Sequence, residues 1–387
     1  MTEQAKVPAI RFAGFTDPWE QRKLSEVATF GGGHTPPMAD PDNYEDGYVL
    51  WVTSQDVKSN YLDRTTTQIT EKGAKELTLY PAGSLVMVTR SGILRHTLPV
   101  AELRKPSTVN QDIRVILPQG ECCGEWLLQF FISHNKELLL EFGKTGTTVE
   151  SVDFGKIKDM LLYMPSTVEQ QQIGDFFAKL DSLITLHQRK YDKLVIFKKS
   201  MLEKMFPKDG ESVPEIRFAG FTDPWEQRKF SEIVDVCSGR DYKHLDEGPI
   251  PVYGTGGYMT SVSEALSHNR DAIGIGRKGT IDKPYLLKAP FWTVDTLFYA
   301  IPKSDINLEF ALCSFLNVDW KSKDESTGLP SLSKESINET VLSVPNVVEQ
   351  NHLGNFFADL DRLITLHQRK LELLRNIKKS LLDKMFV

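Results

Sequence analysis

The sequence has few cysteines, no long apolar run and no excess of positive charge. The four cysteines, Cys122, Cys123, Cys237 and Cys313, have no repeated spacing, so we expect reduced thiols and no disulfide framework. The longest apolar stretches, such as Leu161 to Met164, fall far short of the ~20 residues that a membrane helix needs. Residues 1–8 lack the apolar core of a secretory signal. We therefore expect a cytoplasmic protein that has no membrane partner.

The charge balance does not indicate a nucleic-acid-binding protein. The chain carries 46 basic and 52 acidic residues, a formal net charge of −6, so any contact with DNA must depend on local patches. Its 387 residues are 40% hydrophobic, which is an ordinary globular composition. At ~150 residues per domain, this length suggests two to three folding units.

Catalytic signatures are also missing. An adenine methyltransferase should have a glycine-rich cofactor loop and an Asn/Asp-Pro-Pro-aromatic motif that holds the flipped base. The closest matches are Asp17-Pro18-Trp19 and Asp223-Pro224-Trp225, and both lack the second proline. Gly254 to Tyr258 (GTGGY) lacks the Lys-Ser/Thr of a phosphate loop, and no metal-ligand cluster stands out. We expect a chain without chemistry of its own, with no bound cofactor and no metal.

An internal duplication organises the sequence. The fourteen residues from Ile10 to Lys23 (IRFAGFTDPWEQRK) recur unchanged from Ile216 to Lys229. A second pair, Pro165–Phe206 and Pro345–Phe386, is identical at 26 of 42 positions. The blocks between arm and helix differ in sequence, but both alternate short apolar runs with Gly, Pro, Asn and Asp turns, as in irregular α/β domains. The predicted segments are an arm with the first variable block (1–164), a long helix (165–206), a linker (207–215), the second arm and block (216–344) and a second long helix (345–387).

The two long segments have the heptad spacing of a coiled coil. Their apolar positions alternate steps of four and three, and each helix could run for about 38 residues, or ~57 Å at 1.5 Å per residue. A helix this long needs a partner for its apolar stripe, and the other copy is the nearest candidate. The predicted seam includes Phe177, Leu180, Ile184, His187 and Leu194, and Phe357, Leu360, Ile364, His367 and Leu374. We interpret the two histidines, with Lys198 and Lys378, as polar devices that set the register and not as a metal site.

The arrangement resembles the specificity subunit of type I restriction-modification systems over essentially the whole chain. The resemblance depends on the two RFAGFTDPWEQRK arms, the two P-x-x-V-E-Q helix starts and the two unlike blocks. It implies a mixed α/β (α+β) fold with two target-recognition domains, an antiparallel coiled coil and a pseudo-twofold repeat. Each domain would read one half of a split site in double-stranded DNA, and the helices would set the gap. Two modification subunits, which carry S-adenosylmethionine and methylate adenine, would dock on the halves, and restriction/motor subunits would join the full complex.

Both blocks also resemble the family internally. In LVMVTRSGIL with VNQDIRVIL, and AIGIGRKGTI with TVDTLFYAI, we aligned Arg90 with Arg277 and Asp112 with Asp295. An arginine on a glycine-flanked turn at a strand end can reach a groove and pair with guanine or phosphate. The candidate DNA-facing residues are Thr35, Lys58, Arg90, Arg95 and His96 in the first block, and Arg240, Lys243, His244, Tyr253, Arg277 and Lys278 in the second.

Several alternatives remain open at this level. Arg90 and Arg277 could instead form buried pairs with Asp112 and Asp295. The arm residues Trp19 and Trp225 are expected to pack against a helix or a recognition domain, although the adjoining Arg-Lys pair could contact DNA. The chain could also be a fused methyltransferase and specificity protein, or a coiled-coil adaptor with no DNA role. The missing cofactor motifs oppose the first of these functions, and the shared Arg-x-Gly pattern opposes the second.

Overall fold

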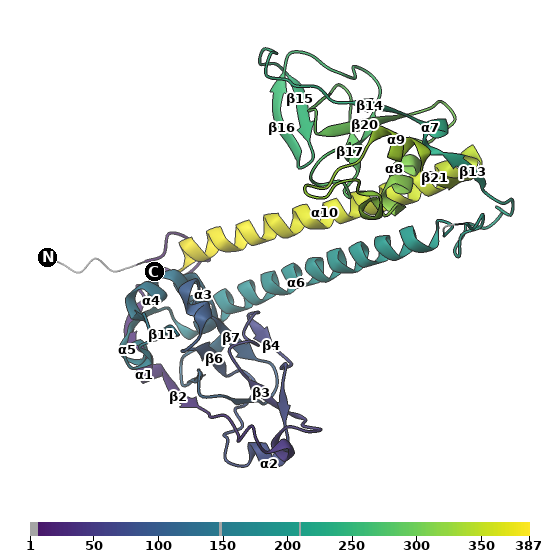
Figure 1. The fold of residues 1–387 in the computed structure, drawn as a ribbon. Coiled ribbons are helices and arrows are strands. Elements are labelled where there is room, and N and C mark those ends of the chain that lie inside the picture. Colours follow the sequence, from purple (N-terminus) through teal and green to yellow (C-terminus); the bar gives the residue numbers. More distant parts are fainter. Residues whose placement is uncertain (1–6, 147–148, 209) are drawn as a thin grey trace. The chain divides into compact units, whose positions relative to one another are not determined.

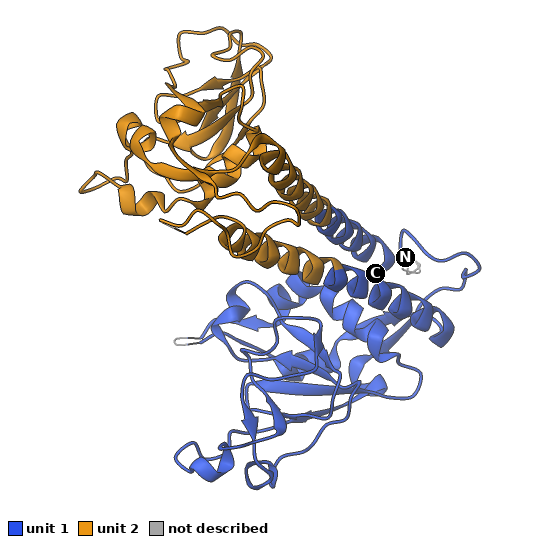
Figure 2. Ribbon diagram, turned by 90° about the vertical axis from the view of Figure 1, so that its right-hand side faces the viewer, with its two compact units in different colours: residues 1–186, 370–387 blue, residues 187–369 orange. Residues whose placement is uncertain are grey.

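The computed structural model describes residues 7–146, 149–208 and 210–387. The chain forms two compact units (Figure 2). Unit 1 comprises residues 1–186 and 370–387, and unit 2 comprises residues 187–369. Each unit therefore holds one arm, one variable block and parts of both long helices. We call the folded variable block of each unit its recognition region. The predicted mixture of helices and strands is confirmed, and no helix in the described ranges is long and apolar enough to cross a bilayer.

The recognition region of unit 1 contains two sheets (Figure 1). The larger sheet has the order β2 (Ala28–Gly32), β9 (Ile113–Pro118), β6 (Leu85–Val88), β7 (Val100–Leu103) and β4 (Tyr61–Leu62). The smaller sheet has the order β5 (Gln68–Ile69), β3 (Val49–Val52) and β8 (Thr108–Val109). The accompanying helices are α1 (Leu24–Val27), α2 (Glu71–Ala74), α3 (Gly124–Ser133), α4 (Asn135–Phe142) and α5 (Phe154–Asp159), and a short ladder joins β10 (Gly143–Lys144) to β11 (Ser151–Val152).

The recognition region of unit 2 repeats this topology with different side chains. Its larger sheet has the order β14 (Val234–Ser238), β20 (Leu297–Pro302), β17 (Ala272–Gly276) and β18 (Tyr285–Leu287). Its smaller sheet has the order β16 (Gly257–Val262), β15 (Ile250–Gly254) and β19 (Trp292–Thr293). In both small sheets the central strand pairs antiparallel with one neighbour and parallel with the other. The helices are α7 (Phe230–Ile233), α8 (Leu308–Asn317) and α9 (Lys334–Glu339).

Each identical arm enters its unit in the same way. Strand β1 (Glu20–Lys23) pairs antiparallel with β12 (Leu161–Met164), and β13 (Glu226–Lys229) pairs antiparallel with β21 (Val341–Val344). Trp19 and Trp225, just before these strands, are buried in the apolar cores, as expected for packing residues. The arm also reaches the last turn of a long helix, because Ile10 N donates to Lys384 O at 2.9 Å and Ile216 N donates to Lys204 O at 2.9 Å.

The long helices are α6 (Thr167–Lys204) and α10 (Val347–Met385), and they pack antiparallel. In unit 2, His187 meets His367 and Lys198 meets Asp361, while Phe206 lies against Phe357, so the partner number falls as the residue number rises. In unit 1, Asp181 meets Lys378, and Phe177 lies against Phe386 in the same sense. The ten predicted seam residues are buried or half-buried, whereas Leu183, Leu186, Leu363 and Leu366, beside the seam, are more than two-fifths exposed.

The histidines of the seam form a polar contact. His187 Nδ1 and His367 Nδ1 are 2.8 Å apart, and both rings are half-buried. One of the two nitrogens must carry the hydrogen and the other must accept it. No group of three or more His, Cys, Asp or Glu side chains that could hold a metal ion occurs among the residues that the structure describes. The contact therefore has the form of a register-setting polar pair.

Each recognition region is joined to its long helix through a close helix crossing. A Cβ atom on Gly174 of α6 would lie 3.1 Å from Glu125 Cβ, and one on Gly354 of α10 would lie 3.1 Å from Glu309 Cβ. Both glycines thus allow α3 or α8 to approach the long helix more closely than an alanine would. Around these crossings, Trp126 and Phe310 are fully buried and anchor the cores of the two units.

A polar network ties the recognition region of unit 1 to both long helices. Asp181 of α6 accepts two bonds from Lys378 Nζ, both at 2.7 Å. Its Oδ2 also accepts from Asn60 Nδ2 at 3.0 Å and from Gln129 Nε2 at 3.3 Å. The Tyr61 hydroxyl lies 3.4 Å from it but donates its hydrogen to Glu125 Oε1 at 2.6 Å. In unit 2, Asp361 occupies the matching helix position and pairs with Lys198, but no described residue of the recognition region donates to it.

Candidate nucleic-acid interface

In unit 2, three of the predicted DNA-facing residues gather around the turn that joins β19 to β20. Arg240 N donates to Thr293 O at 2.9 Å, and Tyr253 O accepts from Val294 N at 3.0 Å. Arg277 Nη1 donates to Asp295 O at 3.3 Å, and the guanidinium lies 5.8 Å from the centre of the Phe298 ring. Arg240 and Arg277 are both exposed. The turn therefore carries two cationic side chains with most of their donors available.

Three other predicted residues of unit 2 lie near this turn or its flanks. The His244 ring lies 6.2 Å from Trp292, and both His244 and Lys243 are exposed. Lys278 follows Arg277 directly, is exposed, and forms an isolated backbone bridge with Ser331. No ion pair involves Lys243, Arg277 or Lys278 in the part of the chain that the structure describes. These cations are free to meet an anionic ligand.

In unit 1, the corresponding turn is polar, with one cation beside it. The Thr35 hydroxyl donates to Gln111 Oε1 at 2.6 Å, and Thr89 N donates to Asp112 O at 2.8 Å. Arg90 follows Thr89, is exposed, and forms an isolated backbone bridge with Ser151. The structure thus brings Thr35 and Arg90 to the two sides of the turn that joins β8 to β9.

The remaining candidates of unit 1 lie elsewhere. Arg95 forms an ion pair with Glu150, and this guanidinium lowers the pKa of the Glu150 carboxyl. His96 is exposed beside the same pair. Lys58 is exposed in a loop organised by Asp56. Burial alone would raise the pKa of Asp56, but four hydrogen bonds from Thr53 and Thr66 hold it below its usual value.

The alignment of Arg90 with Arg277 is wrong by one residue. Val88 pairs with Ile113 at the end of β6, and Gly276 pairs with Leu297 at the end of β17. Because these strand ends correspond, Thr89 matches Arg277 and Arg90 matches Lys278. The bridges of Arg90 with Ser151 and of Lys278 with Ser331 agree with this register.

The acidic residues were misaligned in the same way. The turn residues that match are Gln111 with Asp295 and Asp112 with Thr296, since Thr89 N donates to Asp112 O and Arg277 N donates to Thr296 O. The interpretation of buried arginine–aspartate pairs is also wrong. Arg90 and Arg277 are exposed, and among the described residues the Arg277 side chain bonds to the backbone carbonyl of Asp295 and not to its carboxylate. Aligning the two blocks by identical residues gives the wrong register, because backbone pairing between strands determines which positions are equivalent.

Unit 1 also has a basic pocket whose residues are not among the predicted DNA-facing residues. It has a volume of about 330 Å³, and its walls include Arg114, Lys158 and the rings of Phe30 and Phe154. Lys158 Nζ lies 5.1 Å and 5.5 Å from the centres of these two rings. Arg114 stands on β9 where the alternation of buried and exposed residues directs it away from the core. That alternation was the signal that could have found it.

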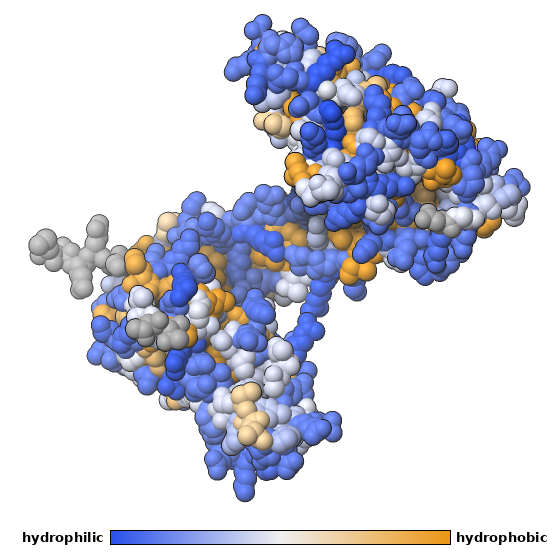
Figure 3. Space-filling view, viewed as in Figure 1, coloured by the Kyte–Doolittle hydropathy of each residue, from blue (hydrophilic) through white to orange (hydrophobic). Residues whose placement is uncertain are grey.

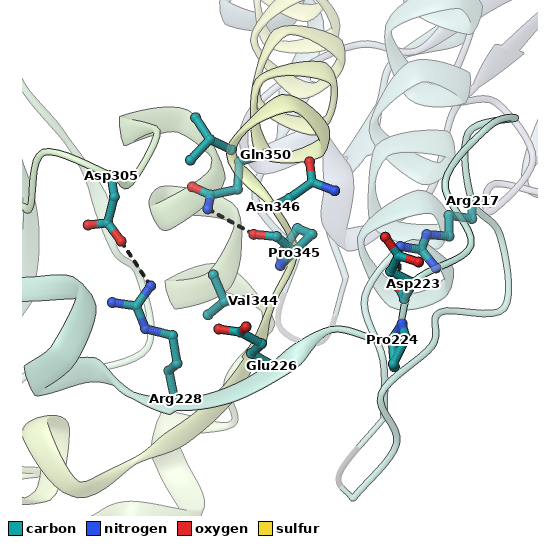
Figure 4. Close-up of a pocket in the computed structure, with 11 residues that line it drawn as sticks. Arg217, Asp223, Pro224, Glu226, Arg228, Asp305, Val344, Pro345, Asn346 and Gln350 are labelled. Atoms are coloured by element: carbon teal, nitrogen blue, oxygen red, sulfur yellow. Dashed lines mark hydrogen bonds and ion pairs between the residues drawn. The ribbon is translucent and has the colours of Figure 1, made fainter.

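Each arm also lines a pocket at the start of a long helix, and we call these the first and second arm pockets. The first, of ≈ 630 Å³, lies in unit 1, and the second, of ≈ 370 Å³, lies in unit 2 (Figure 4). The second pocket is lined by Arg217, Asp223, Pro224, Glu226, Arg228, Asp305, Val344, Pro345, Asn346, Val347 and Gln350.

Two recognition regions of like topology and unlike surface, each attached to the same arm and helix, define a duplicated scaffold protein. Hydrophilic residues cover most of the visible face of both regions (Figure 3). The chain belongs to the family described as type I restriction modification DNA specificity domain, whose model matches residues 16–195 and 222–376. The family resemblance inferred from the sequence is thereby confirmed.

Comparison with individual proteins agrees with this family. The chain is 29% identical over 186 residues to the type I restriction enzyme EcoR124I/EcoR124II specificity subunit of Escherichia coli, covering 45% of this chain and 46% of that protein. It is 28% identical over 234 residues to the MjaIX specificity subunit of Methanocaldococcus jannaschii, covering 57% of this chain and 52% of that protein. The chain thus spans about half the length of these curated relatives.

The similarity of fold extends over the whole chain. The crystal structure of a type I restriction-modification S subunit from M. genitalium superposes with a TM-score of 0.66 at 16% identity, covering 99% of both chains. At this level of identity the match concerns the fold. It agrees with the predicted pair of recognition regions and long antiparallel helices.

Proposed function

We propose that this chain is the DNA sequence-specificity subunit of a type I restriction-modification complex. Each recognition region reads one half of a bipartite site in double-stranded DNA, and the paired helices set the number of unread base pairs between the halves. The observation that carries the proposal is the repeated strand order of the two regions on identical arms. One scaffold that presents two unlike surfaces suits a reader of two unlike sequences.

The chemistry of the complex is assigned to partner subunits. We propose that two modification subunits dock on the two halves, hold S-adenosylmethionine and methylate adenine, and that restriction/motor subunits join for cleavage. This chain is then a non-catalytic cytoplasmic component. Its relatives are named specificity subunits, which supports this division of labour.

The matched cations suggest how each region meets the duplex. Arg90 and Lys278 occupy equivalent positions, so we assign them to a feature that every duplex shares, the phosphate backbone. Thr89 and Arg277, and likewise Gln111 and Asp295, are matched positions with different side chains. Contacts that differ between the regions are the ones that can distinguish bases, because base edges carry the sequence information. Thr35, Arg240 and Tyr253 border the same turns and belong to this second group.

We propose weaker contributions to DNA binding for the remaining predicted residues. Lys58, Lys243 and His244 are exposed and would add contacts at the edge of the bound duplex. Arg95 must leave Glu150 before it can contact DNA, and His96 lies beside that pair. The net charge of −6 means that the isolated chain should bind DNA weakly. Modification subunits would then supply further phosphate contacts.

The proposal is tested by producing the chain together with its modification subunit and sequencing methylated adenines in the host genome. We expect methylation within a two-part motif that has a fixed gap. Arg277→Ala should change or relax one half of the motif, whereas Lys278→Ala should weaken methylation without changing the motif. Methylation by this chain alone would favour a fused methyltransferase, and methylation that is independent of this chain would favour an adaptor without a DNA role. Either result would overturn the proposal.

A further inference from the structure

The two arm pockets are one site built twice. Ten of the eleven residues that line the second arm pocket have a counterpart in the first. Six of the ten pairs are identical: Asp17 and Asp223, Pro18 and Pro224, Glu20 and Glu226, Arg22 and Arg228, Pro165 and Pro345, and Gln170 and Gln350. Glu121 and Asp305 are a conservative pair, each three residues beyond a matched proline of β9 or β20. Arm, strand end and helix start therefore form the same cavity in both units.

The demands of folding explain only part of this identity, such as Gly14 and Gly220, whose positive φ angles favour glycine. Of the fourteen identical arm residues, nine are exposed in both copies: Ile10, Ala13, Gly14, Thr16, Asp17, Pro18, Glu20, Gln21 and Lys23, with their counterparts 206 positions later. Exposed side chains contribute little to stability and tolerate change. The rest of the duplication has diverged, since the long helices retain 26 of 42 residues and the recognition regions far fewer. A surface kept the same in two halves is suited to a ligand that is the same for both halves.

The charge of the pockets excludes a nucleic acid and favours a cation. In the second pocket, Arg228 pairs with Asp305 at 3.0 Å (Figure 4). Arg217 pairs with Glu349 at 2.6 Å. Asp223 and Glu226 form no ion pair among the described residues, although the charge of Asp223 stabilises the nearby Arg217 guanidinium, which also donates to Asp223 O. In the first pocket, Arg22 lies 3.4 Å from Glu26, and Asp17, Glu20 and Glu121 likewise form no ion pair with described residues. These carboxylates repel phosphate and complement arginine or lysine.

We infer that each arm pocket receives a cationic side chain from one modification subunit. This inference depends on the proposed function, which supplies two identical partners for the two halves of the chain. An arginine is the best match, because its planar fork can bond two carboxylate oxygens at once. Asp17 and Glu20, or Asp223 and Glu226, supply such oxygens at the mouth of a cavity large enough for the side chain. The arm thus serves as the docking element that the two unlike recognition regions have in common.

The repeated pocket allows a test by stoichiometry. The first variant combines Asp17→Lys with Glu20→Lys, the second combines Asp223→Lys with Glu226→Lys, and a third carries all four changes. The side chains of these residues make no hydrogen bond or ion pair with the described residues. Asp17 and Asp223 act on Arg11 and Arg217 through their charge alone, so the cost of their reversal to the fold should be small. Glu137→Lys in α4 and Glu335→Lys in α9 are matched controls, since both residues are exposed and lie outside the pockets.

Native mass spectrometry of the complex with the modification subunit gives the readout. We expect two modification subunits on the unchanged chain and on both controls, one on the first and second variants, and none on the third. Affinity at the altered half should fall by at least about tenfold, because a like charge then meets the cation. The milder Glu20→Gln and Glu226→Gln variants should lose part of the salt dependence of assembly. Circular dichroism and thermal melts check that the variants fold.

Three outcomes separate the inference from the proposed function. If all variants bind two modification subunits as tightly as the unchanged chain, the pockets are not docking sites, although the function stands. If the variants bind both subunits but lose affinity for DNA, the pockets serve the duplex and the inference is overturned. If the unchanged chain binds no modification subunit, the proposed function itself fails.

Discussion

The buried ion pair between Asp181 and Lys378 offers a test that has a control inside the same chain. We compare Lys378→Met with Lys198→Met, because the two lysines occupy equivalent positions in the repeated helices. The side chains of Lys378 and Asp181 are 10% and 9% exposed, whereas those of Lys198 and Asp361 are 18% and 44% exposed. Methionine keeps the length and apolar stem of lysine but removes its charge.

The expected costs follow from this difference in burial. Removing one partner of a buried pair costs about 3–5 kcal/mol, because it leaves an uncompensated charge in the interior. The cost for Lys378→Met should lie near the lower bound, since Asp181 retains donors on Asn60 and Gln129. Lys198→Met should cost only about 0–1 kcal/mol, as water can solvate the carboxylate of Asp361.

Thermal unfolding and hydrogen exchange can measure the two costs. At about 2–4 °C per kcal/mol for a unit of this size, Lys378→Met should lower the melting temperature of unit 1 by about 6–12 °C, and Lys198→Met that of unit 2 by less than about 4 °C. Hydrogen exchange of peptides around Asp181 assigns the loss to unit 1, because two compact units need not melt together. Adding Asp181→Asn to Lys378→Met should recover part of the loss. Equal losses in the two variants, or a loss below about 1 kcal/mol for Lys378→Met, would refute the reasoning.

Three other predictions concern the spacing, the pH dependence and the modularity of the chain. Inserting one heptad after both Lys190 and Lys370 adds about 10 Å to the helix pair, near three base pairs at ~3.4 Å each, and should lengthen the gap of the methylated motif or abolish methylation; retained methylation with an unchanged gap would contradict the spacing role. Burial raises the pKa of Glu102 to about 7 from its usual 4.5, against the effect of Arg104 and with a contribution from Glu125. The folded state therefore holds this proton more tightly, so the stability of unit 1 should be highest below about pH 4.5 for this group and fall as the pH rises through about 7; Glu102→Gln should flatten that part of the melting-temperature profile, and an unchanged slope would count against it. Exchanging residues 25–164 for the block of another family member should change one half of the methylated motif only, and a change in both halves would disprove modular reading.

The helical scaffold was predictable because periodicity and duplication are properties of the chain itself. The heptad positions from Phe177 to Leu194 and from Phe357 to Leu374 are buried or half-buried, and the helices begin and end within two residues of the predicted bounds. Because the same heptad segment occurs twice in one chain, the two long helices could be predicted to pair with each other before any contact was known. The fold class followed from the same regularity.

The candidate site was less predictable because strand pairing determines it. Positions 90 and 277 are both arginine, but the backbone hydrogen bonds of the strands make Arg90 equivalent to Lys278. The arm pockets were also missed, since Asp17, Glu121 and Pro165 are distant in sequence and meet only in the folded unit. Sequence reasoning could name the identical arm but could not show that its exposed carboxylates line a cavity.

The polar network around Asp181 sets a physical limit on how freely the recognition regions can be exchanged. The helix residues Asp181 and Asp361 are the same in both halves, yet among the described residues Asp181 alone accepts hydrogen bonds from its recognition region. In unit 2, the buried Cys313 of α8 stands where α3 of unit 1 has Gln129, because both lie four residues beyond the matched Glu125 and Glu309. A graft without matching donors leaves the Asp181 carboxylate with Lys378 alone, in a site that excludes water. The scaffold therefore has similar sequences in its two halves but different requirements for the recognition region that each half holds. Replacing the second recognition region should cost less stability than replacing the first.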